Sequence, residues 1–78
     1  MGKFPKFYGE LHLYSQWEKE VDLHFFMYRL SEIEQLSLAV ISLRSRAKRW
    51  FHRHEAKISR MTTWEELKSL MHKRFLLP

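Results

Sequence analysis

The residues whose types could support chemistry are concentrated between Arg44 and Lys57, in the stretch RSRAKRWFHRHEAK. This stretch holds four arginines, two lysines, two histidines, a tryptophan and a phenylalanine. Three roles fit such a composition: a helix that binds nucleic acid, a metal site, or a helix whose aromatic side packs into a core. The spacing of the residues helps to separate these roles.

A metal site is disfavoured by the spacing of the histidines. His52 and His54 are two residues apart, so on a helix their side chains point about 200° apart and cannot hold one ion together. The zinc-hydrolase pattern His-Glu-x-x-His also fails, because Ile58 stands where the second histidine is needed. The chain has no cysteine, which excludes Cys-containing zinc sites, disulfides and thiol nucleophiles. We therefore expect no metal site and no cofactor.

Groups suited to catalysis are scarce in the rest of the chain. Asp22 is the only aspartate, and the sequence has neither a nucleophile elbow nor a glycine-rich phosphate loop. Every glutamate has a capping or surface explanation, so no pair of acids is left for glycoside hydrolysis. We therefore expect that the protein is not an enzyme.

On a helix, the stretch from Arg44 to Lys57 has two different faces. The apolar face, with residues at spacings of three and four, consists of Ala47, Trp50, Phe51, His54 and Ile58. The basic face consists of Arg46, Arg49, Arg53 and Lys57, and Arg44 and Lys48 extend it. Because Trp50 and Phe51 lie opposite the arginines, they cannot serve as stacking platforms for bases between them. The pattern is that of an amphipathic helix with its aromatic side turned inward.

The basic face has two open interpretations. It is either a solvated surface or a surface for nonspecific contact with RNA phosphates or an acidic partner, with an affinity that falls as salt rises. Sequence-specific DNA reading is disfavoured, because the chain has no asparagine and its glutamines, Gln16 and Gln35, lie outside the stretch. The net charge of +5 is compatible with either interpretation.

The elements that must position these residues are predicted to be helices. From residue 10 to 77 the chain contains no glycine and no proline, which favours helices joined by short turns. Capping boxes of the form Ser/Thr-x-x-Glu mark three helix starts. They pair Ser15 with Glu18, Ser31 with Glu34, and Thr62 with Glu65 or Thr63 with Glu66. Ser45 is the expected cap of the helix that carries the basic face.

Apolar side chains at helical spacing follow each of these starts. The stripes are Trp17, Val21, Phe25 and Tyr28; Ile33, Leu36, Val40 and Leu43; and Trp64, Leu67, Met71 and Phe75. Phe26 lies off the first stripe, which predicts a second buried side, whereas Ser37 and Ser42 are expected to face outward. Helices this short must bury their apolar faces against one another to be stable. We therefore predict a compact all-α domain of four helices over residues 15–78, with Trp17, Trp50 and Trp64 in its core.

Residues 1–14 differ from the rest of the chain. Pro5 and Gly9 oppose helix formation, and Phe4, Phe7 and Tyr8 lie beside them. We expect an extended aromatic arm that docks on the helices, with a disordered tail as the alternative.

No segment of the sequence indicates a membrane. No apolar run approaches the roughly 20 residues that span a bilayer, and no signal peptide is visible. Lys6 stands where a myristoylation signal needs Ser or Thr. We expect no membrane contact and a cytoplasmic location.

The order of several short pieces resembles the retrotransposon gag domain of gypsy-type LTR elements over residues 4–78. The pieces are Pro5-Lys6-Phe7-Tyr8-Gly9, Trp17-Glu18-Lys19-Glu20-Val21 with Phe25 or Phe26, Ala39 with Leu43 and Ala47, Trp50-Phe51, Thr63-Trp64-Glu65-Glu66-Leu67, and Arg74-Phe75. Two positions depart from that family. Ser45 stands where the family often has glycine, and Trp50-Phe51 stands where it usually has two tryptophans.

The resemblance implies the N-terminal lobe of a retroviral-type capsid, excised from a longer gag polyprotein. It implies self-association into virus-like particles by the full-length protein, with this lobe alone a monomer or weak dimer. It also leaves open a domesticated module that binds short peptides. The candidate residues for its arm and groove are Phe4, Phe7, Tyr8, Trp17, Trp50 and Trp64. A basic nucleic-acid-binding domain is the remaining alternative.

Overall fold

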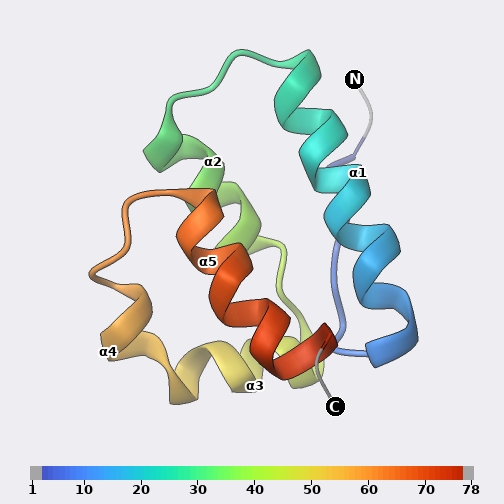
Figure 1. Cartoon of the computed structure of the whole chain (residues 1–78), viewed down its shortest axis with the longest axis vertical. Helices are drawn as coiled ribbons and strands as arrows, with labels where there is room; N and C mark the ends of the chain where they lie inside the picture. Colours follow the sequence, from blue (N-terminus) through green and yellow to red (C-terminus); the bar gives the residue numbers. More distant parts are fainter. Residues whose placement is uncertain (1–2, 77–78) are drawn as a thin grey trace.

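The computed structural model describes residues 3–76 of the chain and is built from helices in that range (Figure 1). The elements are η1 (Leu11–Leu13), α1 (Tyr14–Met27), α2 (Glu32–Ile41), α3 (Ser45–Arg53), α4 (Glu55–Ile58), α5 (Trp64–Met71) and the π-helical turn η2 (His72–Leu76). The prediction of an all-α fold is confirmed. None of the helices in the described range is long and apolar enough to cross a bilayer.

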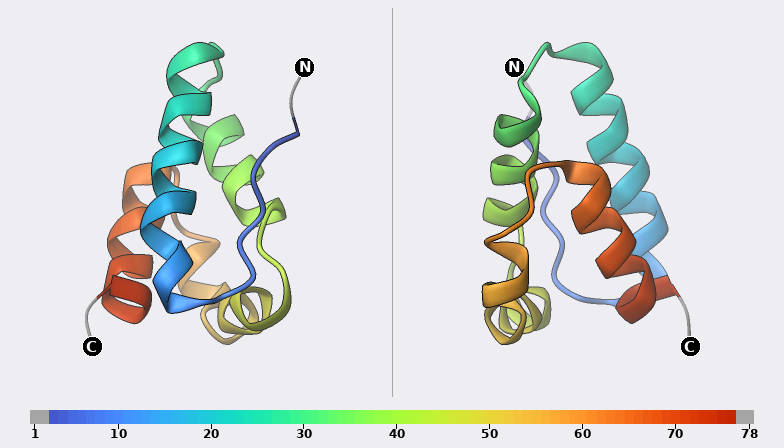
Figure 2. Two further views of the ribbon diagram at one scale, coloured as in Figure 1. Left: turned by 90° about the vertical axis from the view of Figure 1, so that its right-hand side faces the viewer. Right: turned by 60° about the vertical axis from the view of Figure 1, so that its left-hand side comes forward.

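The helices form a small bundle closed at one end by a crossing helix. Figures 1 and 2 show α1, α2 and α5 side by side, with α3 lying across one end of them. The C-terminal end of α1 lies at the opposite end of the molecule from α3 and α4 (Figure 1). The chain before α1 runs back along the bundle as an extended segment (Figure 2).

Two of the predicted capping boxes are confirmed. At the start of α2, the Glu34 N–H donates to Ser31 Oγ over 3.2 Å and the Ser31 N–H donates to Glu34 Oε1 over 2.8 Å. At the start of α5, Thr63 and Glu66 exchange the same pair of bonds, each at 3.1 Å. These bonds satisfy backbone donors that a helix start leaves without partners.

The third predicted capping box, Ser15 with Glu18, is wrong. The turn η1 leads directly into α1, so Ser15 lies inside the helix and Leu13 is its N-cap. Glu18 is used elsewhere, because its Oε1 accepts a hydrogen bond of 2.7 Å from the Tyr14 hydroxyl and also contacts His72 Nε2.

The segment with the basic face departs from the prediction at both ends. Its N-cap is Arg44 rather than Ser45, and Ser45 has a φ of 51°, in the left-handed region that favours glycine. The predicted single helix is broken at His54, whose φ of −115° and ψ of 17° end α3 before α4 begins. Both helices still turn a side chain into the core, Trp50 from α3 and Ile58 from α4.

Aromatic rings supply much of the core. The buried set is Phe7, Tyr14, Trp17, Val21, Leu36, Ala39, Leu43, Ala47, Trp50, Ile58, Trp64, Leu67, Met71 and Phe75. The predicted burial of Trp17, Trp50 and Trp64 is confirmed. Phe75 joins segments distant in sequence, because its ring lies 4.9 Å from that of Phe7 and 5.4 Å from that of Trp50.

Some predicted orientations are wrong. Phe26 is 86% exposed and Ile33 is 55% exposed, so neither belongs to the core, and Tyr28 is exposed as well. Ser42 is buried rather than turned outward, because it lies where the N-terminal segment crosses the end of α2. Its hydroxyl donates 2.7 Å to the Ala39 carbonyl, which removes the cost of burying it.

Candidate interaction surfaces

Residues 3–9, which we call the docked segment, lie against the helices. The Phe7 N–H donates to the Ser42 carbonyl over 3.1 Å, and the Arg44 N–H donates to the Phe7 carbonyl over 2.8 Å. Phe7 and Leu43 thereby form a short parallel β-bridge. Because Phe7 is only 2% exposed, its side chain is part of the core rather than a surface attachment.

The part of the docked segment before Phe7 is held by α1. The Trp17 indole N–H donates to the Pro5 carbonyl over 3.1 Å. The Phe4 ring packs against the rings of His24 and Phe25, with centroids 4.9 and 5.7 Å away. A buried indole needs a hydrogen-bond acceptor, and the Pro5 carbonyl provides it.

Gly9 allows the segment to turn tightly past the start of α3. Its φ is +97°, which side chains rarely adopt, and a Cβ at this position would lie 2.7 Å from Arg46 Cβ and 2.8 Å from the Ala47 nitrogen. Both distances are shorter than real contacts allow, so the turn requires glycine.

The structure places the sequence-derived arm and groove candidates in three groups. Phe4, Phe7 and Trp17 meet at the docked segment. Trp64 packs on Trp17 with ring centroids 5.6 Å apart, and Trp50 reaches Phe7 only through Phe75. Tyr8 is exposed and is not part of this cluster. The space beside Trp17 is therefore occupied by the chain itself.

The basic face is solvent-exposed along α3 and α4. Its exposed members are Arg46, Lys48, Arg49, Arg53 and Lys57. Within residues 3–76, the ion pairs involve Lys68, His52 and His72, and none involves these five cations. Arg44 is set apart from them, since its guanidinium turns back and donates to the carbonyls of Ile41 and Leu43.

Two polar clusters tie α1 to the C-terminal helix. Asp22 Oδ1 accepts 2.7 Å from the Trp64 indole and 3.2 Å from Lys68 Nζ. Burial disfavours the charged form of Lys68, but hydrogen bonds with Glu65 and Asp22 outweigh it and raise the pKa of Lys68. The second cluster joins Tyr14, Glu18 and His72.

The Tyr14 cluster has the character of a structural contact. Burial raises the pKa of the Tyr14 hydroxyl, and its hydrogen bond to Glu18 adds to that effect. In the part of the chain that the structure describes, no three potential metal ligands gather at one place. These polar groups hold helices together, and their partners are internal.

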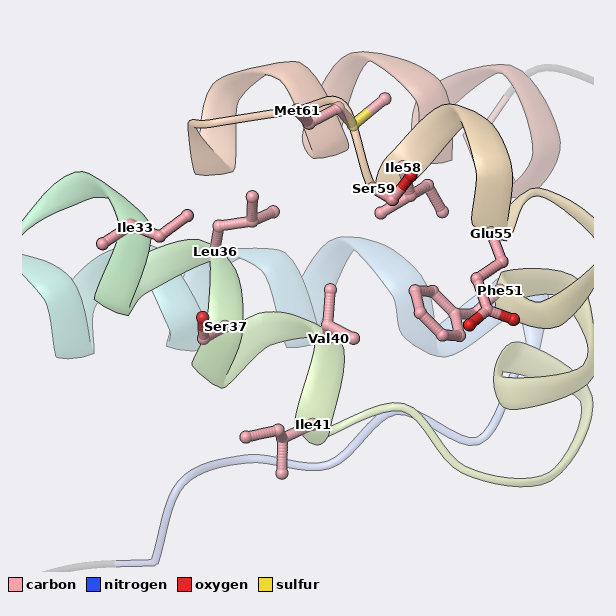
Figure 3. Close-up of a pocket in the computed structure, with 10 residues that line it drawn as sticks. All are labelled: Ile33, Leu36, Ser37, Val40, Ile41, Phe51, Glu55, Ile58, Ser59 and Met61. Atoms are coloured by element: carbon pink, nitrogen blue, oxygen red, sulfur yellow. The ribbon is translucent and has the colours of Figure 1, made fainter.

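An open apolar pocket lies between α2 and the α3–α4 segment, and sequence reasoning missed it. This α2–α4 pocket has a volume of about 390 Å³ (Figure 3). Its lining residues are Ile33, Leu36, Ser37, Val40, Ile41, Phe51, Glu55, Ile58, Ser59 and Met61. The usable signal was the helical spacing of Ile33, Ser37 and Ile41, which puts these three residues on one side of α2, although periodicity assigned Ile33 to the core stripe.

A second apolar surface, the α1 knob, lies at the C-terminal end of α1. It consists of Leu23, Phe26 and Met27, and each of these side chains is more than half exposed. Scattered exposed apolar residues are common, but three on adjoining turns make a contiguous patch of the kind found at interaction sites.

Comparison with known proteins gives one match. The family model described as retrotransposon-derived protein PEG10, N-terminal capsid-like domain, matches residues 2–76. This range includes the docked segment and every helix of the bundle. Neither the comparison with curated proteins nor the comparison with solved structures returned a match.

Proposed function

Because this chain belongs to the N-terminal capsid-like domain family of the retrotransposon-derived protein PEG10, we propose that it works as a structural lobe in capsid assembly. The resemblance to a retrotransposon gag capsid domain is thereby confirmed. The family is a structural one, and the proposed role of this chain is to present surfaces to other copies, without catalysis. The observation that carries the proposal is the family match over residues 2–76.

The packing of the chain supports this role. The Phe7, Tyr14, Trp50 and Phe75 rings lock the docked segment, α1, α3 and η2 into one core. Such a lobe keeps its outer surfaces in fixed relative positions. Many weak contacts between fixed surfaces can then add up to a stable shell, since each contact raises the effective concentration for the next.

The wider setting of the lobe is part of the proposal. We infer that the arm over residues 1–14, whose last four residues are already helical, and the lobe over 15–78 both derive from a longer gag polyprotein of a gypsy-type element. The assembling form would be a virus-like particle in the cytoplasm. A domesticated gene could retain the same lobe for binding other proteins.

The assembly role can be tested by joining copies of the chain in pairs. A parallel two-stranded coiled coil fused after the full chain stands in for a second, dimerising lobe. Sedimentation velocity should then show species larger than the tethered dimer, growing with concentration, while the coiled coil alone stays dimeric. A fusion protein that remains a simple dimer at millimolar concentration would contradict the assembly role.

The docked segment favours a second candidate function, the binding of short extended peptides. Its backbone forms an isolated bridge, in which Phe7 lies opposite Leu43 and exchanges hydrogen bonds with Ser42 and Arg44, so a peptide of similar sequence could compete for the place beside Trp17. The indole N–H signal of Trp17 in nuclear magnetic resonance spectra reports this directly. Adding a peptide with the sequence KFPKFYG should shift that signal, and an unchanged signal at saturating peptide argues against an exchangeable segment.

The basic face favours a nonspecific contact with RNA as an accessory function. Five exposed cations without carboxylate partners in residues 3–76 would each release a counterion on contact with a phosphate. Binding of a mixed-sequence single-stranded RNA should therefore weaken steeply between 50 and 200 mM salt, as is typical of phosphate contacts. Absent or salt-independent binding removes this function.

A further inference from the structure

The α1 knob is an apolar projection that the fold of one copy leaves uncovered. Phe26 is 86% exposed, and Leu23 and Met27 flank it at 58% and 64%. Burying such a side chain contributes about 1.5–3 kcal/mol. The free energy of association would therefore be most favourable with a partner that has an apolar recess in which these side chains can be buried.

The α2–α4 pocket is a recess of suitable size and chemistry. Leu36, Val40 and Phe51 project into the space between α2 and the α3–α4 segment (Figure 3). An engineered apolar cavity of about 150 Å³ is enough to bind benzene. The pocket, at about 390 Å³, can therefore hold the Phe26 ring together with part of a neighbouring side chain.

The charges beside the two surfaces are complementary. Glu55 is the one charged residue in the pocket lining, and its carboxylate lies beside the Phe51 ring (Figure 3). Its contact within the molecule is an exposed pair with His52 at 3.3 Å. Arg29 lies two residues after Met27, in the extended turn that follows α1, is exposed, and has no ion pair within residues 3–76. The arginine in the turn just after the knob is thus opposite in charge to the carboxylate in the pocket lining.

The positions of the two surfaces show that one copy cannot use its own pocket. The knob lies at the free end of α1, and α4, one wall of the pocket, lies at the other end of the molecule (Figure 1). The two surfaces also share no residue. The knob of one copy can therefore bind one neighbour while its pocket binds a second neighbour.

We propose that Phe26 of one copy inserts into the α2–α4 pocket of a second copy, with Arg29 facing Glu55 across the contact. This inference rests on the proposed assembly role and names the surfaces that carry it. The contact is heterologous, because two different surfaces meet. Repetition of a heterologous contact closes into a ring or continues as a filament, depending on the rotation it imposes.

Mixing two variants tests the contact, with unfused full chains at millimolar concentration. Phe26→Ser removes the knob but keeps the pocket, and Ser37→Trp covers the pocket but keeps the knob. Both sites are exposed, so both variants should fold, and each should self-associate at least about tenfold more weakly than the parent. The matched controls are Leu11→Ser and Ser69→Trp, exposed sites outside both surfaces, which should associate like the parent.

The decisive sample combines the two weakened variants. Isotope-labelled F26S still has an open pocket, and unlabelled S37W still has the knob. Adding S37W should therefore shift the amide signals of the pocket residues of F26S, whereas adding unlabelled F26S, which lacks the knob, should not. If mixing restores nothing, or if S37W alone weakens association while F26S does not, the contact is not this one. The latter result would point to α2 pairing with α2. Because the tethered fusion is measured separately, it can still assemble while this inference fails.

A charge exchange gives an independent test of the same contact. Arg29→Glu and Glu55→Arg should each weaken association by about two- to fivefold, within the range of exposed ion pairs. The double variant should recover association close to the parent value. Equal weakening in the single and double variants would show that these two residues do not face each other.

Discussion

Ser45 is the position at which the local sequence and the backbone disagree most clearly. Its φ of 51° lies where a side chain costs roughly 1–2 kcal/mol. The gag family that the sequence resembles often has glycine here, and the φ angle supplies a physical reason for that choice. The chain tolerates serine because Leu43 and Arg44 on its N-terminal side are fixed by the docked segment.

Ser45→Gly should therefore stabilise the protein. We expect the free energy of unfolding to rise by about 0.5–1 kcal/mol, because relief of the left-handed strain outweighs the extra entropy of the unfolded chain. Urea denaturation followed by tryptophan fluorescence measures the change. Ser69→Gly, in the exposed part of α5, is the control and should lower stability by about 0.5–1 kcal/mol. Equal effects at both positions would contradict the strain at Ser45.

Gly9→Ala should have the opposite effect. The added methyl group would meet Arg46 Cβ and the Ala47 nitrogen, and the residue would also be strained at φ +97°. We expect a loss of about 1–3 kcal/mol in the free energy of unfolding. Tyr8→Ala, at the exposed neighbour, should change it by less than about 0.5 kcal/mol. A neutral Gly9→Ala variant would mean that the segment does not dock as described.

At the scale of elements, the two confirmed capping boxes make helix stability depend on pH. The Ser31 N–H and hydroxyl lower the pKa of Glu34 below its usual 4.5, and the N–H groups of Thr62 and Thr63 lower the pKa of Glu66 likewise. A lowered carboxyl pKa contributes stability above the unfolded-state value and loses it as pH falls through the folded-state value.

Glu34→Gln combined with Glu66→Gln should flatten the acid side of the stability profile. The parent should lose stability as the pH falls below about 4.5, and the double variant should lose less over the same interval. Thermal unfolding at a series of pH values measures both profiles. Glu32→Gln, in the first turn of α2 but outside the box, is the control. An equal loss of stability with falling pH in the parent and the double variant would contradict the prediction.

The elements also show what could be predicted from the sequence. The starts of α2 and α5 followed from their capping boxes, and the stripe from Trp64 to Phe75 followed from helical spacing. The start of α1 did not, because η1 precedes it and moves Ser15 into the helix. The break at His54, whose imidazole Nδ1 lies 3.0 Å from the Trp50 carbonyl oxygen, leaves the helical spacing of the apolar residues intact, so periodicity does not reveal it.

The interaction surfaces were less predictable than the helices. Periodicity assigned Ile33 to the core, but in the structure this side chain is 55% exposed and lines the open α2–α4 pocket, because exposure depends on how closely the neighbouring segments pack against that turn. The α2–α4 pocket is lined by side chains from segments on both sides of the turn at Arg44, so it exists only after those segments pack. The sequence showed that Phe26 lies off the apolar stripe of α1. Whether its side chain is buried on a second side of the helix or exposed to solvent could be decided only from the folded structure.

At the scale of the whole molecule, stability depends on one aromatic core in a chain of 78 residues. Phe75→Ala should remove the ring that joins Phe7, Tyr14 and Trp50, at a cost of about 3–5 kcal/mol. This is comparable to the total stability expected of a small domain, so the variant should be largely unfolded at 37 °C. Far-ultraviolet circular dichroism measures this, and a fully helical variant would contradict it. Phe26→Ala is the matched control and should melt like the parent, because its ring is exposed.

Assembly of this lobe into larger species can be measured as the mass distribution of the tethered dimer in sedimentation velocity. The tethered lobes should give species well above the dimer mass, in amounts that grow with concentration, whereas the coiled coil without a lobe should give none. A single boundary at the dimer mass across the whole concentration range would contradict assembly.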